Sequence, residues 1–233
     1  MGNRPLNRLL ASLPDPDFAR LSPDLLNIPS KLKQVFHQTG EPVRHVYFPN
    51  GGVISVTAAL KTGVFVEVAT VGDEGMVGLE AFFGIDALAQ GDTMMQVPDT
   101  SVEMLSVEAF AREIATRGAL HDVMGRYAQL TVAQMMRSTA CNALHHVQER
   151  CCRWLLMTHD RVHRDDFQLS HEFLGMMLGV RRQTVTVVAG TLQKAGLISY
   201  SHGHIRVVDR AALEAAACEC YASIQEQVSL LHL

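Results

Sequence analysis

Cysteine and histidine side chains recur in the sequence at spacings that could bind a metal ion. Cys141, His145 and Glu149 stand four residues apart, and so do His159 and His163. On a helix such residues share one face, and thiolate, imidazole and carboxylate groups are the ligands that zinc uses. The same spacing is common among ordinary surface and hinge residues. We therefore predict such ordinary roles for these residues and no metal site.

The chain contains five cysteines, of which Cys151 and Cys152 are adjacent. An odd number and an adjacent pair are not typical of a disulfide framework, so we expect reduced thiols. Cys218 and Cys220 would lie about 200° apart on a helix, and they are predicted to pack rather than to chelate one ion together. A redox role for Cys141, Cys151 or Cys152 stays open as an alternative, because these thiols lie near a predicted hinge.

No group of residues indicates catalysis, since nucleophiles with a base and paired carboxylates occur only as scattered candidates. The glycine-rich stretch from Gly72 to Gly78 lacks the lysine of a phosphate-binding P-loop and carries two acids. We interpret it as turns of a sheet. The sequence predicts that the chain has no catalytic residue and is not an enzyme.

Residues 169–195 have the pattern of two short helices joined by a glycine turn. Ser170 can cap the first helix, and Gly179 can adopt the positive φ that ends it. In the second helix apolar residues recur at i, i+3, i+4 and i+7, which marks its buried side as Val185, Val188, Ala189 and Leu192. This pattern is typical of the helix-turn-helix, whose second helix enters the major groove of DNA.

The opposite face of the second helix is the predicted reading face. Arg182 could donate to guanine and Gln183 could pair with adenine, whereas Val187 suits a thymine methyl group. An alternative is that the N-terminal domain covers Val187 in an inactive state. Residues 197–208 predict a two-stranded hairpin, the wing. The predicted DNA-binding residues are Ser170, His171, Arg181, Arg182, Gln183, Thr184, Thr186, Val187, Lys194, His202 and His204.

Charge is distributed unevenly along the 233 residues, although the net charge is only −4. Residues 62–111 contain nine acids and no lysine or arginine, whereas residues 150–210 contain nine basic residues and five acids. This local positive charge favours double-stranded DNA as the partner of the C-terminal half. No apolar run is long enough for a membrane span, and no secretory signal is recognised, so we expect a cytoplasmic location without membrane contact.

The N-terminal half has the pattern of short strands separated by turns such as Pro49-Asn50-Gly51-Gly52 and Lys61-Thr62-Gly63. Turns every 8–12 residues are typical of a β-sandwich or barrel. A long helix follows from about Leu120 to a break at residues 140–142. We expect a homodimer formed through this helix by Leu120, Met124, Tyr127, Leu130 and Met135, while another face of the helix covers the sheets; a helix buried within one large monomer is the alternative.

The chain resembles the CRP/FNR superfamily of transcription regulators. The resemblance rests on LSHE at residues 169–172, LGVRRQTV at 178–185, LQKAGLI at 192–198 and His204-Ile205, with Gly40-Glu41-Pro42 and VYFP at 46–49 in the N-terminal half. It implies an α+β fold with a jelly-roll-like β-roll sensor domain at residues 1–118, a dimerisation helix and hinge at 119–142, and a winged helix-turn-helix at 143–233. It also implies a homodimer on a pseudo-palindromic operator, with RNA polymerase as a candidate partner.

The sequence departs from the family in its sensor region. The stretch from Gly78 to Gln90 lacks the arginine that members binding cyclic AMP place beside the phosphate, and no cysteine precedes Cys141. We therefore expect neither cyclic AMP in the usual pose nor an iron–sulfur cluster, and no cofactor is assigned. An unidentified effector would bind near Gly72, Glu74, Gly75, Gly78 and Glu80. The alternative function is an effector-binding or thiol-redox sensor that acts through protein contacts.

Overall fold

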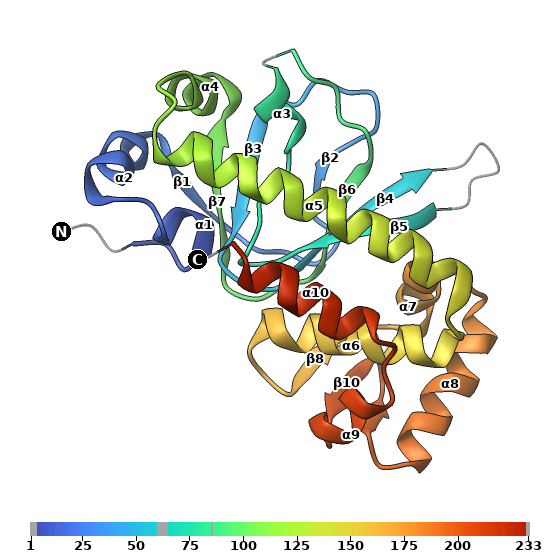
Figure 1. The fold of residues 1–233 in the computed structure, drawn as a ribbon. Helices are drawn as coiled ribbons and strands as arrows, with labels where there is room; N and C mark the ends of the chain where they lie inside the picture. Colours follow the sequence, from blue (N-terminus) through green and yellow to red (C-terminus); the bar gives the residue numbers. More distant parts are fainter. Residues whose placement is uncertain (1–3, 60–64, 85, 232–233) are drawn as a thin grey trace.

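The computed structural model describes residues 4–59, 65–84 and 86–231. Its N-terminal part, the β-domain, contains two antiparallel sheets with strand orders β1-β7-β3 and β2-β6-β4-β5 (Figure 1). The strands are β1 (Leu26–Pro29), β2 (Val35–His37), β3 (His45–Pro49), β4 (Val53–Ala59), β5 (Phe65–Val71), β6 (Asp92–Val97) and β7 (Ser101–Ser106). The predicted β-sandwich or roll is thus confirmed, while the turn predicted at residues 61–63 lies outside the described residues.

Alternation along the strands creates the core of the β-domain. In β3, Val46 and Phe48 are fully buried, whereas the intervening Tyr47 is only partly buried. Short helices close the ends of the sheets, and Phe110 from the last of them joins Phe48 in the core. These helices are α1 (Arg8–Ala11), α2 (Asp15–Leu21), the 3-10 turn η1 (Ser22–Asp24), α3 (Glu80–Phe83) and α4 (Val107–Ala115).

The long helix α5 (Ala119–Leu144) runs across the β-domain and on to the C-terminal part of the chain (Figure 1). Its 26 residues correspond to about 39 Å at 1.5 Å per residue. The break predicted at residues 140–142 is wrong, because that segment holds no proline or glycine and its hydrogen bonds continue to His145. The chain turns instead at His146, whose side chain and Glu149 form a capping box at the start of α6 (Val147–Val162).

The C-terminal domain has its own core around Trp154, Phe167, Leu174 and Val185. It contains α6, α7 (His171–Leu178), α8 (Arg182–Lys194), α9 (Arg210–Ala215) and the strands β8 (Asp166–Gln168), β9 (Ile198–Ser201) and β10 (His204–Val207). The three strands form one antiparallel sheet in the order β8-β10-β9. The predicted two-stranded wing therefore gains a third strand, which precedes the helix-turn-helix in sequence.

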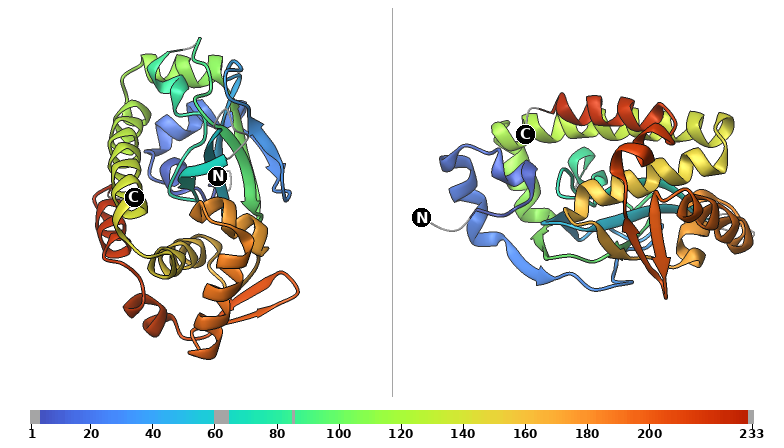
Figure 2. Two further views of the ribbon diagram at one scale, coloured as in Figure 1. Left: turned by 90° about the vertical axis from the view of Figure 1, so that its right-hand side faces the viewer. Right: turned by 90° about the horizontal axis from the view of Figure 1, so that it is seen from below.

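The last helix, α10 (Cys220–Ser229), packs on both domains, and its Tyr221 belongs to the core of the C-terminal domain. It lies alongside α5 in both views of Figure 2, and Leu231 after it enters the core of the β-domain. The end of the segment predicted as the C-terminal domain, residues 143–233, thus also contacts the N-terminal half, and the boundaries of that domain stay a prediction. Apolar burial holds α10 in this position, since Ile224 joins the core of the C-terminal domain and Leu231 joins that of the β-domain.

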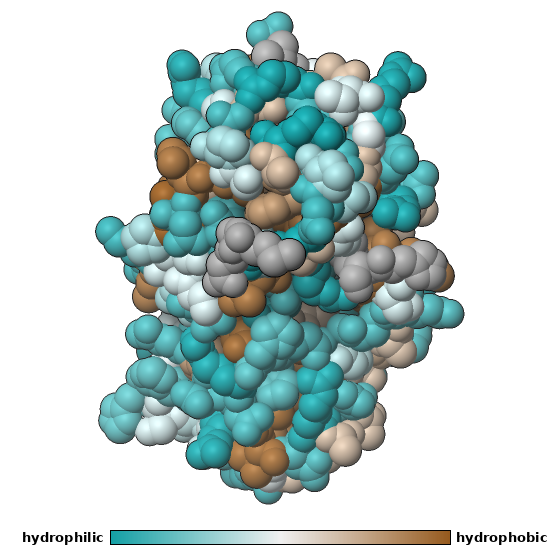
Figure 3. All heavy atoms as spheres, turned by 90° about the vertical axis from the view of Figure 1, so that its left-hand side faces the viewer, coloured by the Kyte–Doolittle hydropathy of each residue, from teal (hydrophilic) through white to brown (hydrophobic). Residues whose placement is uncertain are grey.

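The surface shown in Figure 3, seen from the left of Figure 1, is mostly hydrophilic, with small and separate hydrophobic areas. Among the described residues, no helix combines the length and the apolar character that crossing a membrane requires.

Candidate DNA-binding interface

Helix α7 begins and ends as its sequence predicts. The Ser170 hydroxyl accepts a hydrogen bond from the Phe173 amide at 3.2 Å, and Gly179 ends the helix with φ of 63°. Gly175 lies where α7 approaches the turn, and a Cβ at this position would be 2.9 Å from the carbonyl oxygen of Val180. A close backbone contact therefore sets the angle between α7 and the next helix.

The burial of α8 follows the predicted helical period. Val185, Val188, Ala189 and Leu192 are buried against the domain core. The residues of the opposite face are exposed, namely Arg181, Arg182, Gln183, Thr186, Val187 and Lys194, while Thr184 is half-buried. Val187 is 69% exposed, so the β-domain does not cover it in this structure. Arg181 precedes the helix without a side-chain cap, which leaves its guanidinium free of the backbone.

His171 connects the parts of the motif to one another. Its ring stacks on Tyr200 of β9 with centroids 4.0 Å apart, and its Nδ1 lies 3.0 Å from the Thr186 hydroxyl of α8. Burial, assisted by the nearby charge of Arg182, lowers the pKa of His171, so the ring is neutral at pH 7. The predicted DNA-binding residues His171 and Thr186 are therefore engaged within the domain in this structure.

The wing ends in a tight turn at His202 and Gly203, which have φ of 48° and 81°. Two consecutive residues with positive φ are typical of a type I′ hairpin, and a glycine at the second position avoids steric strain. The turn leaves His202 and His204 exposed next to α8. The structure thus brings the predicted reading face and the wing to one side of the domain.

A known protein family and several solved structures are similar to this chain. Residues 149–216 match the family model described as the Crp-like helix-turn-helix domain. Among solved structures with the same fold are FixK2 from Bradyrhizobium japonicum, at 17% identity and a TM-score of 0.70 over 83% of this chain and 98% of that chain. A CRP-family transcriptional regulator from Thermus thermophilus is 24% identical, with a TM-score of 0.66 over 82% of this chain and 96% of that chain. The fold and the helix-turn-helix are those of the CRP/FNR regulators.

A CRP/FNR-family regulator from Eubacterium rectale extends the similarity to 91% of this chain and 98% of its own, with 16% identity and a TM-score of 0.66. No sequence among the curated proteins matches the chain. The resemblance found in the sequence is confirmed for the fold and for the helix-turn-helix. Residues 149–216 therefore form a Crp-like helix-turn-helix domain, and the chain as a whole has the fold of the CRP/FNR-family structures.

The two domains of the chain are joined by buried and half-buried polar contacts. Arg161 at the end of α6 pairs with Glu74 at 2.6 Å, and each side chain is only 7% exposed. Trp154 Nε1 donates to Glu67 Oε1 of β5 at 2.9 Å, and burial raises the pKa of Glu67 to about 8. A separate cleft of about 470 Å³ is lined by residues of both domains, and in it Lys33 is 5.6 Å from the ring centroid of Phe173.

The residues predicted to bind an effector are occupied by contacts within the chain. Glu74 is held by Arg161, and the Glu80 carboxylate accepts a hydrogen bond from the Gln90 amide at 3.0 Å. A Cβ at Gly72, Gly75 or Gly78 would come within 3 Å of Arg161, Tyr127 or His37, respectively. These glycines therefore permit close packing, and in this structure the region is closed rather than open to a ligand.

Most residues predicted to form the dimer interface instead face their own β-domain. Leu120, Met124, Tyr127 and Leu130 are at most 5% exposed, and the Tyr127 hydroxyl donates to the carbonyl of Met76 at 3.0 Å. Their assignment to a dimer interface stays a prediction, although α5 is apolar on more than one side and this side packs on the sheets of its own chain. Met135 is 36% exposed, and the outer apolar side of α5 also carries Val132 and Met136.

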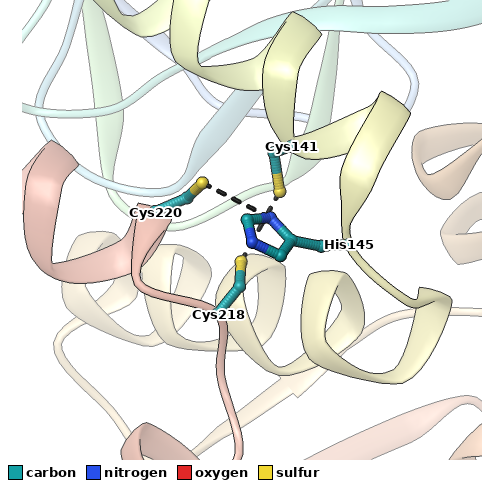
Figure 4. A group of neighbouring side chains, drawn as sticks. All are labelled: Cys141, His145, Cys218 and Cys220. Carbon is teal, nitrogen blue, oxygen red and sulfur yellow. Dashed lines mark hydrogen bonds between the residues drawn. The ribbon is translucent and has the colours of Figure 1, made fainter.

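Four side chains with metal-binding groups meet where α5 ends and α10 begins (Figure 4). They are Cys141, His145, Cys218 and Cys220, whose potential ligand atoms all lie within 4.8 Å of one another. The prediction that Cys218 and Cys220 do not chelate one ion together assumes that residues 218–220 are helical. Cys218 in fact lies in the segment before α10, and its thiol lies 3.5 Å from that of Cys141. In the sequence, the i, i+4 spacing of Cys141 and His145 is the signal that indicates this cluster.

The other two cysteines are buried in the C-terminal domain and do not join this cluster. Burial raises the pKa of the Cys152 thiol to about 11 and also raises that of Cys151. Because the thiolate is the reactive form, a redox role for these two residues has no support here.

Proposed function

We propose that this regulator binds double-stranded DNA sequence-specifically, with α8 in the major groove and the β9-β10 wing beside it. The observation that carries this proposal is the exposed face of α8, which starts with Arg181 and Arg182 and continues through Gln183 to Val187. Residues at the start of a recognition helix reach base edges, and arginine recognises guanine through two hydrogen bonds. Exposed Val187 supplies an apolar surface that suits a thymine methyl group.

The experiment selects binding sites from random duplex DNA with the full chain and then measures affinity by fluorescence anisotropy. Arg182→Ala should lose about 1–3 kcal/mol at one base pair and relax specificity there. Arg44→Ala, an exposed arginine of the β-domain, is the matched control and should bind like the wild type. A uniform loss over all sequences would instead assign Arg182 to a phosphate.

Salt dependence separates this function from a module that acts only through protein contacts. Each phosphate contact releases counterions, so the affinity for DNA should fall steeply between 50 and 200 mM salt, by about 10³-fold or more if six phosphates are contacted. An unchanged affinity over this range would contradict the DNA-binding proposal and favour the winged domain as a protein interface.

We further propose that two copies pair through the outer side of α5 and bind a pseudo-palindromic operator. The supporting observation is a stripe of uncharged residues spaced alternately by four and three positions, Gly125, Gln129, Val132, Met136, Thr139 and Ala143. This is the spacing of a coiled-coil seam, and small residues in it let two helices approach closely. Val132 and Met136 are 57% and 70% exposed in the single chain.

The dimer is tested by analytical ultracentrifugation at micromolar concentration. Met136→Glu should yield monomers, because two carboxylates would face each other across an apolar seam. Phe83→Glu introduces the same charge at a side chain that is 75% exposed on α3, and it should stay dimeric. A wild-type monomer, or a dimer unaffected by Met136→Glu, would show that α5 is not the interface.

For regulation we propose an effector other than cyclic AMP in its usual pose. The described part of residues 78–90 holds no cation to offset a buried phosphodiester, and Glu80 lies within it. Cyclic AMP should therefore leave the melting temperature unchanged in a thermal-shift screen that also includes other nucleotides and small acids. A clear stabilisation by cyclic AMP would overturn this part of the proposal. RNA polymerase remains a candidate partner, to be tested by transcription from a selected operator.

A further inference from the structure

Four potential ligand side chains gather at the junction of α5 and α10 within 4.8 Å of one another, and two of the distances between them are close to those of a tetrahedral metal site. Cys141 Sγ lies 3.5 Å from Cys218 Sγ, and Cys220 Sγ lies 3.6 Å from His145 Nδ1. With Zn–S and Zn–N bonds of about 2.3 and 2.0–2.1 Å, the edges of a tetrahedral site measure about 3.8 Å between sulfurs and about 3.6 Å from sulfur to nitrogen. The side chains converge on a common centre from both elements (Figure 4).

A carboxylate orients the histidine toward this centre. His145 Nε2 lies 3.0 Å from Glu219 Oε2, so Nε2 can donate its proton to the carboxylate while Nδ1 faces the thiols. A carboxylate on the second nitrogen is the usual support of a zinc-bound histidine, because it fixes the tautomer and the ring orientation. The arrangement is independent of the cysteines, and it provides the ring nitrogen that a metal would need.

Burial and charge also fit a bound cation. Cys141, Cys218 and Cys220 are at most 5% exposed and the His145 side chain is 20% exposed, so four protein groups would fill a tetrahedral site. Three thiolates around one Zn²⁺ would leave a net charge of −1. Arg153 is 7% exposed, and its charge acts on Cys141 and Cys218 as well as on the Glu67 carboxyl. The metal-thiolate group would balance this buried arginine.

We propose that Cys141, His145, Cys218 and Cys220 bind one Zn²⁺ ion in a closed structural site. The site joins Cys141 in the last turn of α5, and His145 directly after that helix, to the segment that starts α10. These ligands lie next to His146, where the chain turns from α5 into α6 and the C-terminal domain begins. Zinc would therefore hold α10 along α5 and restrain the hinge between the long helix and the DNA-binding domain.

The test uses the full chain, stripped of metal under reducing conditions and titrated with CoCl₂, because tetrahedral cobalt thiolates absorb visible light strongly. We expect one Co²⁺ per chain, displaced by one equivalent of ZnCl₂, and a zinc-dependent rise in melting temperature. Cys218→Ser should abolish stoichiometric binding and the stabilisation. Cys151→Ser is the matched control, since this buried cysteine lies outside the cluster.

A second variant keeps the proposal testable if Cys218→Ser fails to fold. The Glu219 side chain is 72% exposed, so Glu219→Gln should fold and still bind one metal ion, with affinity reduced by about 10–100-fold. The proposal is overturned if the folded, reduced wild type binds no cobalt, or if both cysteine variants bind it equally. It is also overturned if the native thiols form a disulfide between Cys141 and Cys218 and bind no zinc after reduction.

Discussion

Arg161 and Glu74 form a buried ion pair that joins the end of α6 to the turn after β5. Arg161 Nη2 lies 2.6 Å from Glu74 Oε1, and the same guanidinium donates to the hydroxyl and the carbonyl of Thr70 at 2.5 and 3.2 Å. Burial opposes ionisation of Glu74, but Arg161 lowers the pKa of its carboxyl below the ordinary value. The pair therefore couples the β-domain to the DNA-binding domain through two charges that stabilise each other.

Breaking this pair should be costly. Arg161→Met leaves the Glu74 carboxylate buried without its partner, so the free energy of unfolding should fall by about 3–5 kcal/mol in urea denaturation. Arg164→Met is the matched control, because its pair with Asp99 is more exposed and contributes about 0–1 kcal/mol. Equal losses in the two variants would mean that burial does not strengthen the Arg161 contact.

Glu67 should make stability fall as the pH rises. Its pKa is raised from 4.5 to about 8 in the folded chain, so folding favours the protonated carboxyl. This contribution is complete below pH 4.5 and is lost as the pH rises toward 8. Glu67→Gln keeps an acceptor for Trp154 and cannot ionise, so its stability relative to the wild type should increase between pH 5 and 9. A constant difference in denaturation experiments would contradict the raised pKa.

Two glycines of the helix-turn-helix should respond to alanine with opposite signs. Gly175→Ala places a Cβ 2.9 Å from the Val180 carbonyl oxygen, and overpacking of this kind costs about 1–3 kcal/mol. At Gly190, in the interior of α8, nothing lies within 4 Å of the new Cβ, so alanine should stabilise by about 0.5–1 kcal/mol. Thermal unfolding of both variants measures the signs, and stabilisation by Gly175→Ala would show that the turn can move.

His171 should act as a positioning residue. His171→Ala removes the stack on Tyr200 and the contact with Thr186, and the free energy of unfolding should fall by about 1 kcal/mol. His204→Ala removes an exposed side chain of the wing and should leave stability unchanged. If His171→Ala is as stable as the wild type but binds its operator with altered sequence preference, His171 contacts a base instead.

The sequence by itself determined the helix-turn-helix, because its signals are local. The Ser170 cap, the positive φ of Gly179 and the buried residues from Val185 to Leu192 depend only on neighbours within one or two turns of helix. The order of strands, long helix and winged domain also followed from patterns with short periods. The family resemblance rested on the same segments.

Only the tertiary structure decided which sides of α5 are covered. Its sequence is apolar on several faces, so periodicity could not tell that Leu120 and Met124 pack on the sheets while Met136 stays exposed. The metal-binding cluster was equally hidden, because Cys141 and Cys218 are 77 residues apart and meet only when α10 returns along α5. Contacts between distant segments depend on how whole helices and strands pack. The spacing of residues within one segment does not indicate that packing.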